Sequence, residues 1–168
     1  SGGSISELLD RTEVYELVRL YIHDGYGSNI ESWFISQSFK WLKENTNIKA
    51  LISYADPKEG HAGTIYQATN WLYQGNSIRP NDTYSFKLKP DDEWIHGRTL
   101  ANTYKTNDIE KLKKKIGHTF WYRVEPLKHR YVYLLKNKRK LMKHLKHPIK
   151  PYPKADDVDD LKVTKVVV

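Results

Sequence analysis

The sequence predicts an α/β domain in which a mixed β-sheet is flanked by helices, and observations in residues 13–75 carry this prediction. The apolar run 14–22 is rich in β-branched and aromatic residues and indicates a buried strand, and a second short apolar run covers 48–54. Between them, apolar residues recur at helical spacing from Ile30 to Leu42. A strand, a helix and a strand in this order favour a right-handed crossover with parallel strand pairing.

A glycine loop separates the first predicted strand from the helix. Ser28 and Glu31 have the spacing of a capping box, in which Ser28 caps the helix and Glu31 reaches back. Backbone N–H groups and the helix dipole at such a turn attract an anion. We therefore expect Gly25, Tyr26, Gly27 and Ser28 to contribute to cofactor binding. A plain strand-to-helix turn is the alternative interpretation of the same residues.

Shorter signals predict the rest of the chain. A second helix is expected over 64–73, followed by Gly75 just beyond its end. Further strands are predicted over 84–88, 119–124 and 130–135, a short helix over 107–116, a basic helix over 138–145 and an added edge strand over 163–168. We expect a flexible segment at 1–12, one domain at 13–154 and a C-terminal tail at 155–168.

Composition narrows the classes of function. The chain has 168 residues and a net charge of +8, which points to an anionic partner. It has no cysteine, which excludes disulfide, thiolate and zinc-thiolate chemistry. No apolar run approaches the roughly 20 residues of a membrane-spanning helix. We expect no membrane partner and a cytoplasmic location.

The densest group of polar residues lies in the predicted loop 53–63. Asp56 directly follows a predicted buried strand, and His61 and Tyr66 come within ten residues of it. A carboxylate, an imidazole and a phenol together can remove and deliver protons. Ligands of open α/β sheets lie at the carboxyl ends of the strands, so we expect a catalytic site here. The alternatives are that Asp56 caps the next helix, that His61 braces the loop and that Tyr66 packs half-buried.

Residues 128–154 contain ten Lys or Arg and no Asp or Glu, with tyrosines interleaved. Basic and aromatic residues in this combination are typical of a nucleic-acid surface. We expect DNA-binding roles for Lys128, Arg130, Lys138, Arg139, Lys140 and Lys143. A solvated basic helix without a ligand is the alternative.

A metal site is a further hypothesis. His23 and Asp24 follow the first predicted strand and could pair with Asp56 or His61. Oxygen and imidazole ligands would suit iron or manganese. No local ligand spacing supports such a site, so the sequence assigns no metal ligands.

Several separated motifs resemble, in the same order, the phage Mom family of DNA-modification proteins. These motifs are ELVRLYI, a helix containing SW, SYADPKEGHAGTIYQATNWLYQG, KHRYVYLL and PYPK, and the resemblance covers residues 13–154. It implies a fold similar to the GCN5-related N-acetyltransferases, with an acetyltransferase-like (GNAT-like) mixed sheet. It also implies transfer of a carbamoylmethyl-type group to the N6 amine of adenine in double-stranded DNA, which protects phage DNA from host restriction enzymes.

The resemblance implies functional roles for Arg19, Ser32, Asp56 and Tyr66. Asp56 would orient or deprotonate the adenine amine, and Tyr66 would donate a proton or position the base. Ser32 and the glycine loop would hold the group donor. Arg19 is expected within a strand, where an ion pair with a nearby carboxylate is its alternative role.

The resemblance also implies a cofactor and partners. Iron is associated with the family, whereas the glycine loop departs from the usual acetyltransferase signature and argues against acetyl-CoA. The N-terminal strands of the fold are expected to be missing, so a second chain or self-association would complete the sheet. Two alternative functions stay open: an acyl-CoA-dependent N-acetyltransferase acting on a small amine or modified nucleotide, and a non-catalytic DNA-binding remnant.

Overall fold

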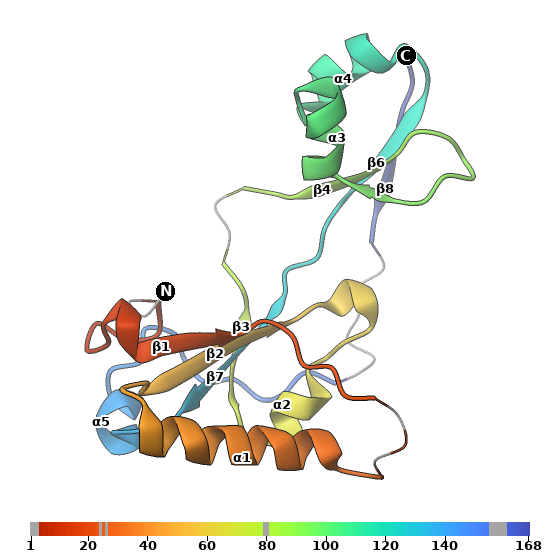
Figure 1. Cartoon of the computed structure of the whole chain (residues 1–168). Helices are drawn as coiled ribbons and strands as arrows, with labels where there is room; N and C mark the ends of the chain where they lie inside the picture. Colours follow the sequence, from red (N-terminus) through yellow and green to blue (C-terminus); the bar gives the residue numbers. More distant parts are fainter. Residues whose placement is uncertain (1–3, 24, 26, 79–80, 155–160) are drawn as a thin grey trace. The chain divides into compact units, whose positions relative to one another are not determined.

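The computed structural model describes residues 4–23, 25, 27–78, 81–154 and 161–168. The chain forms two compact units, each with its own sheet (Figure 1). Unit 1 comprises Ser1–Ser77 and Leu127–Asp157, and unit 2 comprises Ile78–Pro126 and Val158–Val168. No helix in the described ranges has both the length and the apolar character that crossing a membrane requires.

Sheet A of unit 1 has the strand order β1-β2-β7-β3. The strands are β1 (Val14–Leu17), β2 (Ala50–Ala55), β7 (His129–Leu134) and β3 (Leu72–Asn76). β1 and β2 are parallel and are joined through α1 (Ile30–Asn45), while β7 runs antiparallel to both β2 and β3. The predicted strand–helix–strand crossover and the mixed sheet are therefore confirmed.

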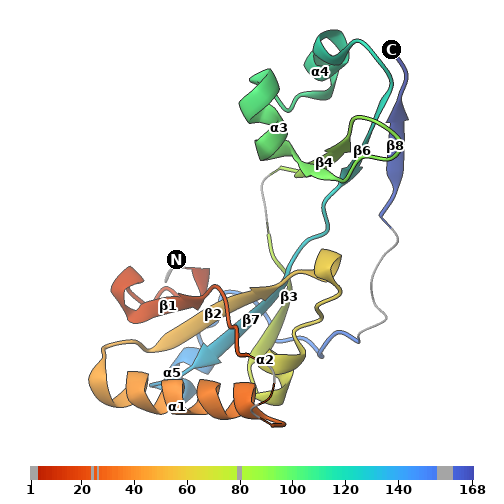
Figure 2. The same ribbon diagram turned by 45° about the vertical axis from the view of Figure 1, so that its right-hand side comes forward.

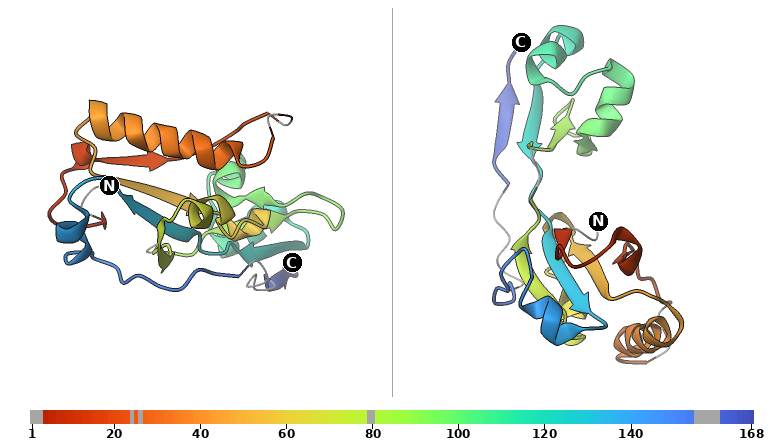
Figure 3. Two further views of the ribbon diagram at one scale, coloured as in Figure 1. Left: turned by 90° about the horizontal axis from the view of Figure 1, so that it is seen from below. Right: turned by 90° about the vertical axis from the view of Figure 1, so that its left-hand side faces the viewer.

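Alternation along β2 and β7 gives sheet A two packed faces. One face joins Ile52 and Val132 to Ile5 and Leu9 of the N-terminal segment, and to Leu141 of α5 (Lys138–Met142). The other face packs against α1 and α2 (Thr64–Ala68), with α1 lying along the sheet in Figures 1 and 3. This second face is rich in aromatic side chains, namely Phe39, Tyr66, Trp71, Tyr73, Tyr131 and Tyr133.

The N-terminal segment is more than a flexible leader over its described part. Ile5 is fully buried and Leu9 is 6% exposed, both in the core of sheet A. Asp10 then caps a 3-10 turn, η2 (Arg11–Glu13), by accepting from the Thr12 N–H, and the Glu13 carboxylate accepts from the Asp10 N–H. The expectation of a loose segment over 1–12 therefore does not fit residues 4–12.

Two predicted elements are wrong in extent. The strand predicted over 14–22 ends at Leu17, because β1 is an edge strand, and Val18 and Tyr21 are 81% and 74% exposed. The helix predicted over 64–73 ends at Ala68. Asn70 takes a left-handed conformation (φ 61°) that stops the helix, and the following residues form β3.

The predicted capping box at the start of α1 is also absent. The residue at the N-cap is Asn29, in a left-handed conformation (φ 68°), and its side chain makes no capping hydrogen bond. Ser28 lies one residue too early and is exposed. The periodic apolar spacing was thus a better guide to this helix than its capping residues.

Sheet B of unit 2 has the strand order β5-β4-β6-β8, with every pair antiparallel. The strands are β5 (Ile95–His96), β4 (Tyr84–Lys87), β6 (Phe120–Val124) and β8 (Val163–Val166). Two helices, α3 (Gly97–Tyr104) and α4 (Ile109–Ile116), lie on the same side of the sheet (Figures 2 and 3). Their contacts with β4 and β6 form a core of Phe86, Leu100, Leu112 and Phe120.

The sequence predicted most elements of unit 2. The strands near 84–88 and 119–124, the helix near 107–116 and the edge strand near 163–168 are confirmed. Helix α3 was not predicted, since it begins with Gly97. Its cap is the His96 side chain, whose Nδ1 accepts from the Arg98 N–H, and histidine is not a usual capping residue.

Candidate functional site

The Tyr66 hydroxyl lies inside sheet A's aromatic face, at the middle of β2. Ser53 Oγ is 2.6 Å from the Leu17 carbonyl oxygen and 2.7 Å from the Tyr66 hydroxyl. Ser53 has one hydroxyl proton and a carbonyl oxygen only accepts, so Ser53 donates to Leu17 and Tyr66 donates to Ser53. The Tyr66 ring contacts Trp71 and Tyr131, each at a centroid distance of 5.1 Å. Tyr66 therefore has its proton engaged and its oxygen lone pairs left as acceptors.

Tyr131 fixes the loop that leads into α2. Its hydroxyl donates to the Ala62 carbonyl, and Gln67 Nε2 donates to it at 3.2 Å. Burial raises the pKa of Tyr131 to about 12, so the phenol keeps its proton at neutral pH. The loop passes so close that a Cβ at Gly63 would collide with the Tyr131 ring. Gly63 also has a φ of +83°, which is a further reason for glycine here.

Asp56 is half-buried at the carboxyl end of β2 and joins the polar loop to the basic segment. Its Oδ1 accepts from the Lys58 N–H at 3.1 Å, which caps the 3-10 turn η3 (Pro57–Glu59). Its Oδ2 lies 3.2 Å from Lys128 Nζ. Asp56 therefore does act as a capping residue, which was the alternative interpretation of its position. The ion pair with Lys128 adds a contact that the sequence did not indicate.

His61 is exposed, and its backbone N–H donates to the Asp56 carbonyl at 3.2 Å. This backbone contact fits the interpretation in which His61 belongs to a braced loop. Within the described ranges, no hydrogen bond or ring contact connects the Asp56 side chain with His61 or Tyr66. The loop-to-helix segment holds all three, yet its geometry does not join them into a proton relay.

Ser32 lies in a different place from Asp56. With Lys40 and Lys43 of α1, it lines a groove of about 400 Å³ between α1 and the α2–β3 turn, where Thr69 and Tyr133 form the opposite wall. Ser32 is only partly exposed in this groove. The structure thus brings Ser32 near the end of α2 instead of near the loop after β2.

Arg19 and the glycine loop follow β1. Arg19 lies beyond the end of the strand and is exposed, so its expected place within a strand is wrong. Gly25 and Gly27 have φ values of +104° and +87°, which residues other than glycine rarely adopt. Tyr26 falls outside the described residues, as does Asp24.

Arg130 is not a surface cation. It is 7% exposed, and burial lowers the pKa of its guanidinium. Its Nε donates to Gln74 Oε1 at 2.9 Å and its Nη1 to the Tyr54 hydroxyl at 3.2 Å. Its Nη2 donates to the Ser4 carbonyl at 2.8 Å. The expected contact of Arg130 with a DNA phosphate does not fit this burial, because alternation along β7 turns the side chain into the same face as Val132.

The other expected DNA-binding residues are exposed. They are Lys128, Lys138, Arg139, Lys140 and Lys143. Four of them lie on α5 or directly after it, and Leu141 buries the opposite side of that helix against sheet A. The basic helix is thus anchored by one apolar residue and presents its cations outward.

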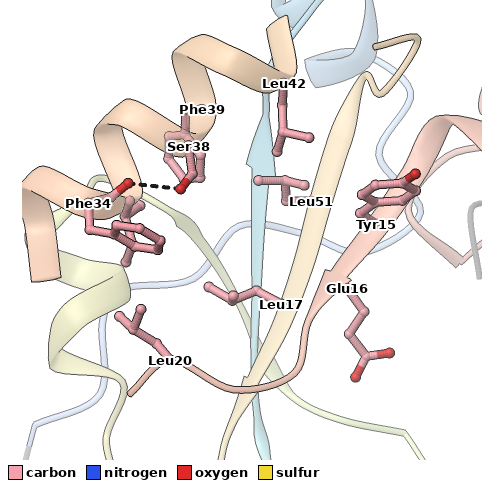
Figure 4. A pocket seen from close by; sticks show the side chains of 10 residues that line it. Tyr15, Glu16, Leu17, Leu20, Phe34, Ser38, Phe39, Leu42 and Leu51 are labelled. Atoms are coloured by element: carbon pink, nitrogen blue, oxygen red, sulfur yellow. Dashed lines mark hydrogen bonds between the residues drawn. The ribbon is translucent and has the colours of Figure 1, made fainter. Parts of the chain in front are cut away.

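The sequence did not indicate a pocket beside β1. It has apolar walls and a volume of about 150 Å³, and it lies between the β1 edge and α1 (Figure 4). Leu17 and Leu20 approach it from one side, and Phe34, Phe39 and Leu42 of α1 from the other. It has little polar lining and no titratable residue other than Tyr15 and Glu16 at its rim.

The hypothesis of a metal pair finds no set of ligands in the described part of the chain. There, no group of three or more His, Asp or Glu residues lies close enough together to hold a metal ion. One member of the pair, Asp24, is outside the described residues.

The fold and the site define a basic α/β protein. Asp56 follows β2, the second strand of the parallel crossover, and Tyr66 packs beside that strand. A sequence model of the Mom protein family matches residues 2–154, and the chain belongs to this family. The chain is also similar to a curated protein, the methylcarbamoylase mom of Escherichia phage Mu, with 28% identity over 162 residues. The match covers 92% of this chain and 62% of the phage Mu protein, so the chain spans less than two thirds of that relative's length.

Proposed function

We propose that this protein modifies phage DNA by transferring a carbamoylmethyl-type group to the N6 amine of adenine. The observation that carries the proposal is the family match over residues 2–154, which includes the loop after β2 and the basic segment. The likeness to a protein named methylcarbamoylase supports the class of group transferred. Such a modification would protect the DNA from host restriction enzymes and would take place in the cytoplasm of the host cell.

In the proposed reaction, Asp56 acts on the adenine amine. A bond forms between N6 and the methylene carbon of the donor, the donor's leaving group departs, and Asp56 accepts a proton from the amine. Its side chain is 29% exposed and lies at the carboxyl end of β2, where ligands of open α/β sheets bind. Lys128, paired with Asp56, is itself in the basic segment and would lie beside a DNA phosphate.

Tyr66 is better suited to hold the base than to donate a proton. Its proton is engaged by Ser53, so its oxygen would accept a hydrogen bond from the substrate. Ser32, Gly25 and Gly27 remain candidates for holding the donor, and Arg19, exposed after β1, remains a candidate for contact with an anionic group. Adenine in duplex DNA must leave the base stack to be modified, and cations on α5 would hold the flanking phosphates.

The proposed fold relationship is to the acetyltransferase-like (GNAT-like) proteins. The parallel β1–β2 pair with α1 as its crossover, in an otherwise antiparallel sheet, supports it. We also propose that a second chain, or a second copy, pairs with β1. Within the described part of the chain this strand has a partner on one side only, Tyr15 is 54% exposed, and an apolar pocket adjoins the edge. Light scattering should show association as concentration rises, and a monomer at all concentrations would contradict this part.

The substitution Asp56→Asn tests the catalytic proposal. Asparagine keeps the side-chain oxygen that caps η3 but loses the charge and the base, and it is as good an N-cap residue as aspartate. We expect the modified adenosine to fall by about 10²- to 10⁴-fold, measured by mass spectrometry of nucleosides from DNA of cells that express the full chain. The melting temperature should change little.

Asp10→Asn is the matched control, because Asp10 caps a 3-10 turn in the same way but lies away from the loop after β2. Its modification level should equal that of the wild-type chain. Equal levels in Asp56→Asn would contradict the catalytic role. If the wild-type chain binds DNA but yields no modified adenosine, the non-catalytic DNA-binding alternative gains support.

A further inference from the structure

Strand alternation divides the side chains of β6 between the two faces of sheet B. Phe120 and Tyr122 enter the core that α3 and α4 cover. Trp121 and Arg123 point to the opposite face, where neither helix lies (Figures 2 and 3). This open face of sheet B is therefore shaped by strand side chains alone and by the segment between β4 and β5.

The strand register places a lysine on each side of Trp121. Lys87 of β4 and Lys165 of β8 are its direct cross-strand partners. Lys165 Nζ lies 5.9 Å from the centroid of the Trp121 ring. The row of direct partners across β4, β6 and β8 therefore places the Trp121 indole between the cations of Lys87 and Lys165.

A second indole, from Trp94 between β4 and β5, contacts the remaining cations of this face. The guanidinium carbon of Arg123 lies 4.3 Å from the Trp94 ring centroid, and Lys87 Nζ lies 5.6 Å from it. The Arg123 side chain makes no hydrogen bond to any described residue, and its Nε is buried without a partner. Arg123 is therefore held by ring contact and not by a protein acceptor.

In the described part of the chain, no ion pair involves Lys87, Arg123 or Lys165, although Asp91, Asp92 and Glu93 lie in the segment between β4 and β5. Glu125 follows β6, but it is 8% exposed and its Oε1 accepts from the buried Ser85 hydroxyl. The face accordingly combines three cations with two indoles and complements an anionic ligand that has flat rings.

We propose that the open face of sheet B binds a single-stranded segment of DNA. Lys87, Arg123 and Lys165 would contact phosphates, and one base would stack on Trp121. Strands about 4.8 Å apart make three of them roughly 10 Å wide, which suits one nucleotide chain. A duplex keeps its base faces inside the stack, whereas the bases of an unpaired strand are free to stack on an exposed indole. The proposal shares the DNA partner of the proposed function but concerns another surface, so its test measures binding.

The test compares two ligands by fluorescence anisotropy on the full chain. One is a labelled oligothymidylate of about twelve nucleotides, within the site sizes of single-strand binders, and the other is an abasic strand of the same length. Trp121→Ile keeps a strand-forming residue and removes the indole. It should weaken oligothymidylate binding about tenfold and leave abasic binding unchanged. Lys165→Gln should lower the slope of log K against log salt by about 0.7.

Two control variants remove the same groups elsewhere. Trp33→Leu removes an indole that is 58% exposed on α1, and Lys114→Gln removes an exposed cation from α4, on the covered side of sheet B. Both should bind as the wild-type chain does. Unchanged oligothymidylate binding in Trp121→Ile, or equal losses in the controls, would overturn the proposal.

Lys165→Gln lies on the exposed edge strand and decides the matter if Trp121→Ile does not fold, because an unchanged salt slope then contradicts the proposal. Nucleoside mass spectrometry on the wild-type chain keeps the two proposals separate. Base-dependent binding through Trp121 without modified adenosine would support this surface and overturn the proposed function. Modified adenosine without base-dependent binding would support the proposed function and overturn the proposal for this surface.

Discussion

Sheet A and sheet B each have four strands but differ in how their faces are covered. Sheet A packs on both faces, against the N-terminal segment and α5 on one side and α1 and α2 on the other. The helices of sheet B pack on one face. A polar side chain on an interior strand of sheet A, such as Arg130, therefore finds its partners inside the protein, whereas Arg123 of sheet B lies on a face that neither helix covers.

Two arginines show the difference. Arg130 of β7 and Arg123 of β6 both lie on interior strands of their sheets. All three guanidinium nitrogens of Arg130 donate hydrogen bonds within unit 1. Arg123 is stacked on Trp94 and makes no hydrogen bond to any described residue. The residue type alone therefore does not indicate how an arginine is held, whereas the covering of its sheet face differs between the two.

The largest expected effect tests whether the two sheets are separate cooperative units. Phe120 is fully buried in unit 2, so Phe120→Ala should cost about 3–5 kcal/mol of the stability of that unit. Hydrogen exchange of the full chain should show faster exchange in residues 81–126 and unchanged protection in β2 and β7. Trp71→Ala, in the core of unit 1, should give the reciprocal pattern. Loss of protection throughout the chain in both variants would show that the two sheets unfold as one cooperative unit.

The second prediction concerns the two arginines directly. Arg130→Met should cost on the order of 3 kcal/mol, because it removes the donor to the buried Gln74 side chain and the hydrogen bonds to Tyr54 and the Ser4 carbonyl. Arg123→Met should cost less than about 1 kcal/mol, since methionine can keep the contact with the Trp94 ring. Urea unfolding followed by circular dichroism measures both. Equal costs would show that the covering of the sheet does not decide the role of these side chains.

A third prediction uses the raised pKa of Tyr131, a residue of the doubly covered sheet. In the unfolded chain the phenol ionises near pH 10, but in the folded protein it holds its proton up to a pKa of about 12. The stabilisation is therefore complete below pH 10 and is lost as the pH rises toward 12. The loss amounts to about 2 kcal/mol at pH 12. Urea unfolding from pH 9 to 11.5 should show a smaller loss of stability in Tyr131→Phe, and parallel curves would refute the assignment.

The smallest expected effect is on Tyr66. Tyr66→Phe removes the proton donated to Ser53 but leaves the Ser53 bond to Leu17, so it should cost about 1 kcal/mol of stability. If Tyr66 positions the base, modified adenosine should fall by more than this loss of folded protein explains. Thermal unfolding and nucleoside mass spectrometry on the same variant separate the two effects. A level of modified adenosine equal to wild type would leave Tyr66 with a packing role only.

The parts of the fold that the sequence predicted depend on local patterns. The crossover through α1 follows from apolar periodicity, and strands β4, β6 and β8 of sheet B follow from alternation, which needs no knowledge of partners; β5 was not predicted. The end of α2 was missed because it depends on one left-handed residue, Asn70, in a stretch where Trp71 and Tyr73 continue the apolar pattern.

The candidate site was predictable only in its position along the chain. Asp56 follows a strand, as expected, but its pairing with Lys128 joins residues that are far apart in the sequence. The role of Arg130 was not predictable, because its acceptors come from Ser4, Tyr54 and Gln74 in three other segments. The sequence held one signal of its burial: Arg130 alternates with Val132 and Leu134, which are buried on the same face of β7.

The position of β7 in sheet A has a consequence for synthesis on the ribosome. β7 lies between β2 and β3, yet roughly fifty residues of unit 2 are made after β3 and before β7. At translation rates of about 5–20 residues per second, the two strands wait for several seconds without the strand that joins them. During that time each presents unpaired backbone N–H and C=O groups along an edge that β7 later fills. The nascent chain therefore passes through a stage in which chaperones can bind these edges, and the order of translation, not only the final contacts, sets how safely this sheet is assembled.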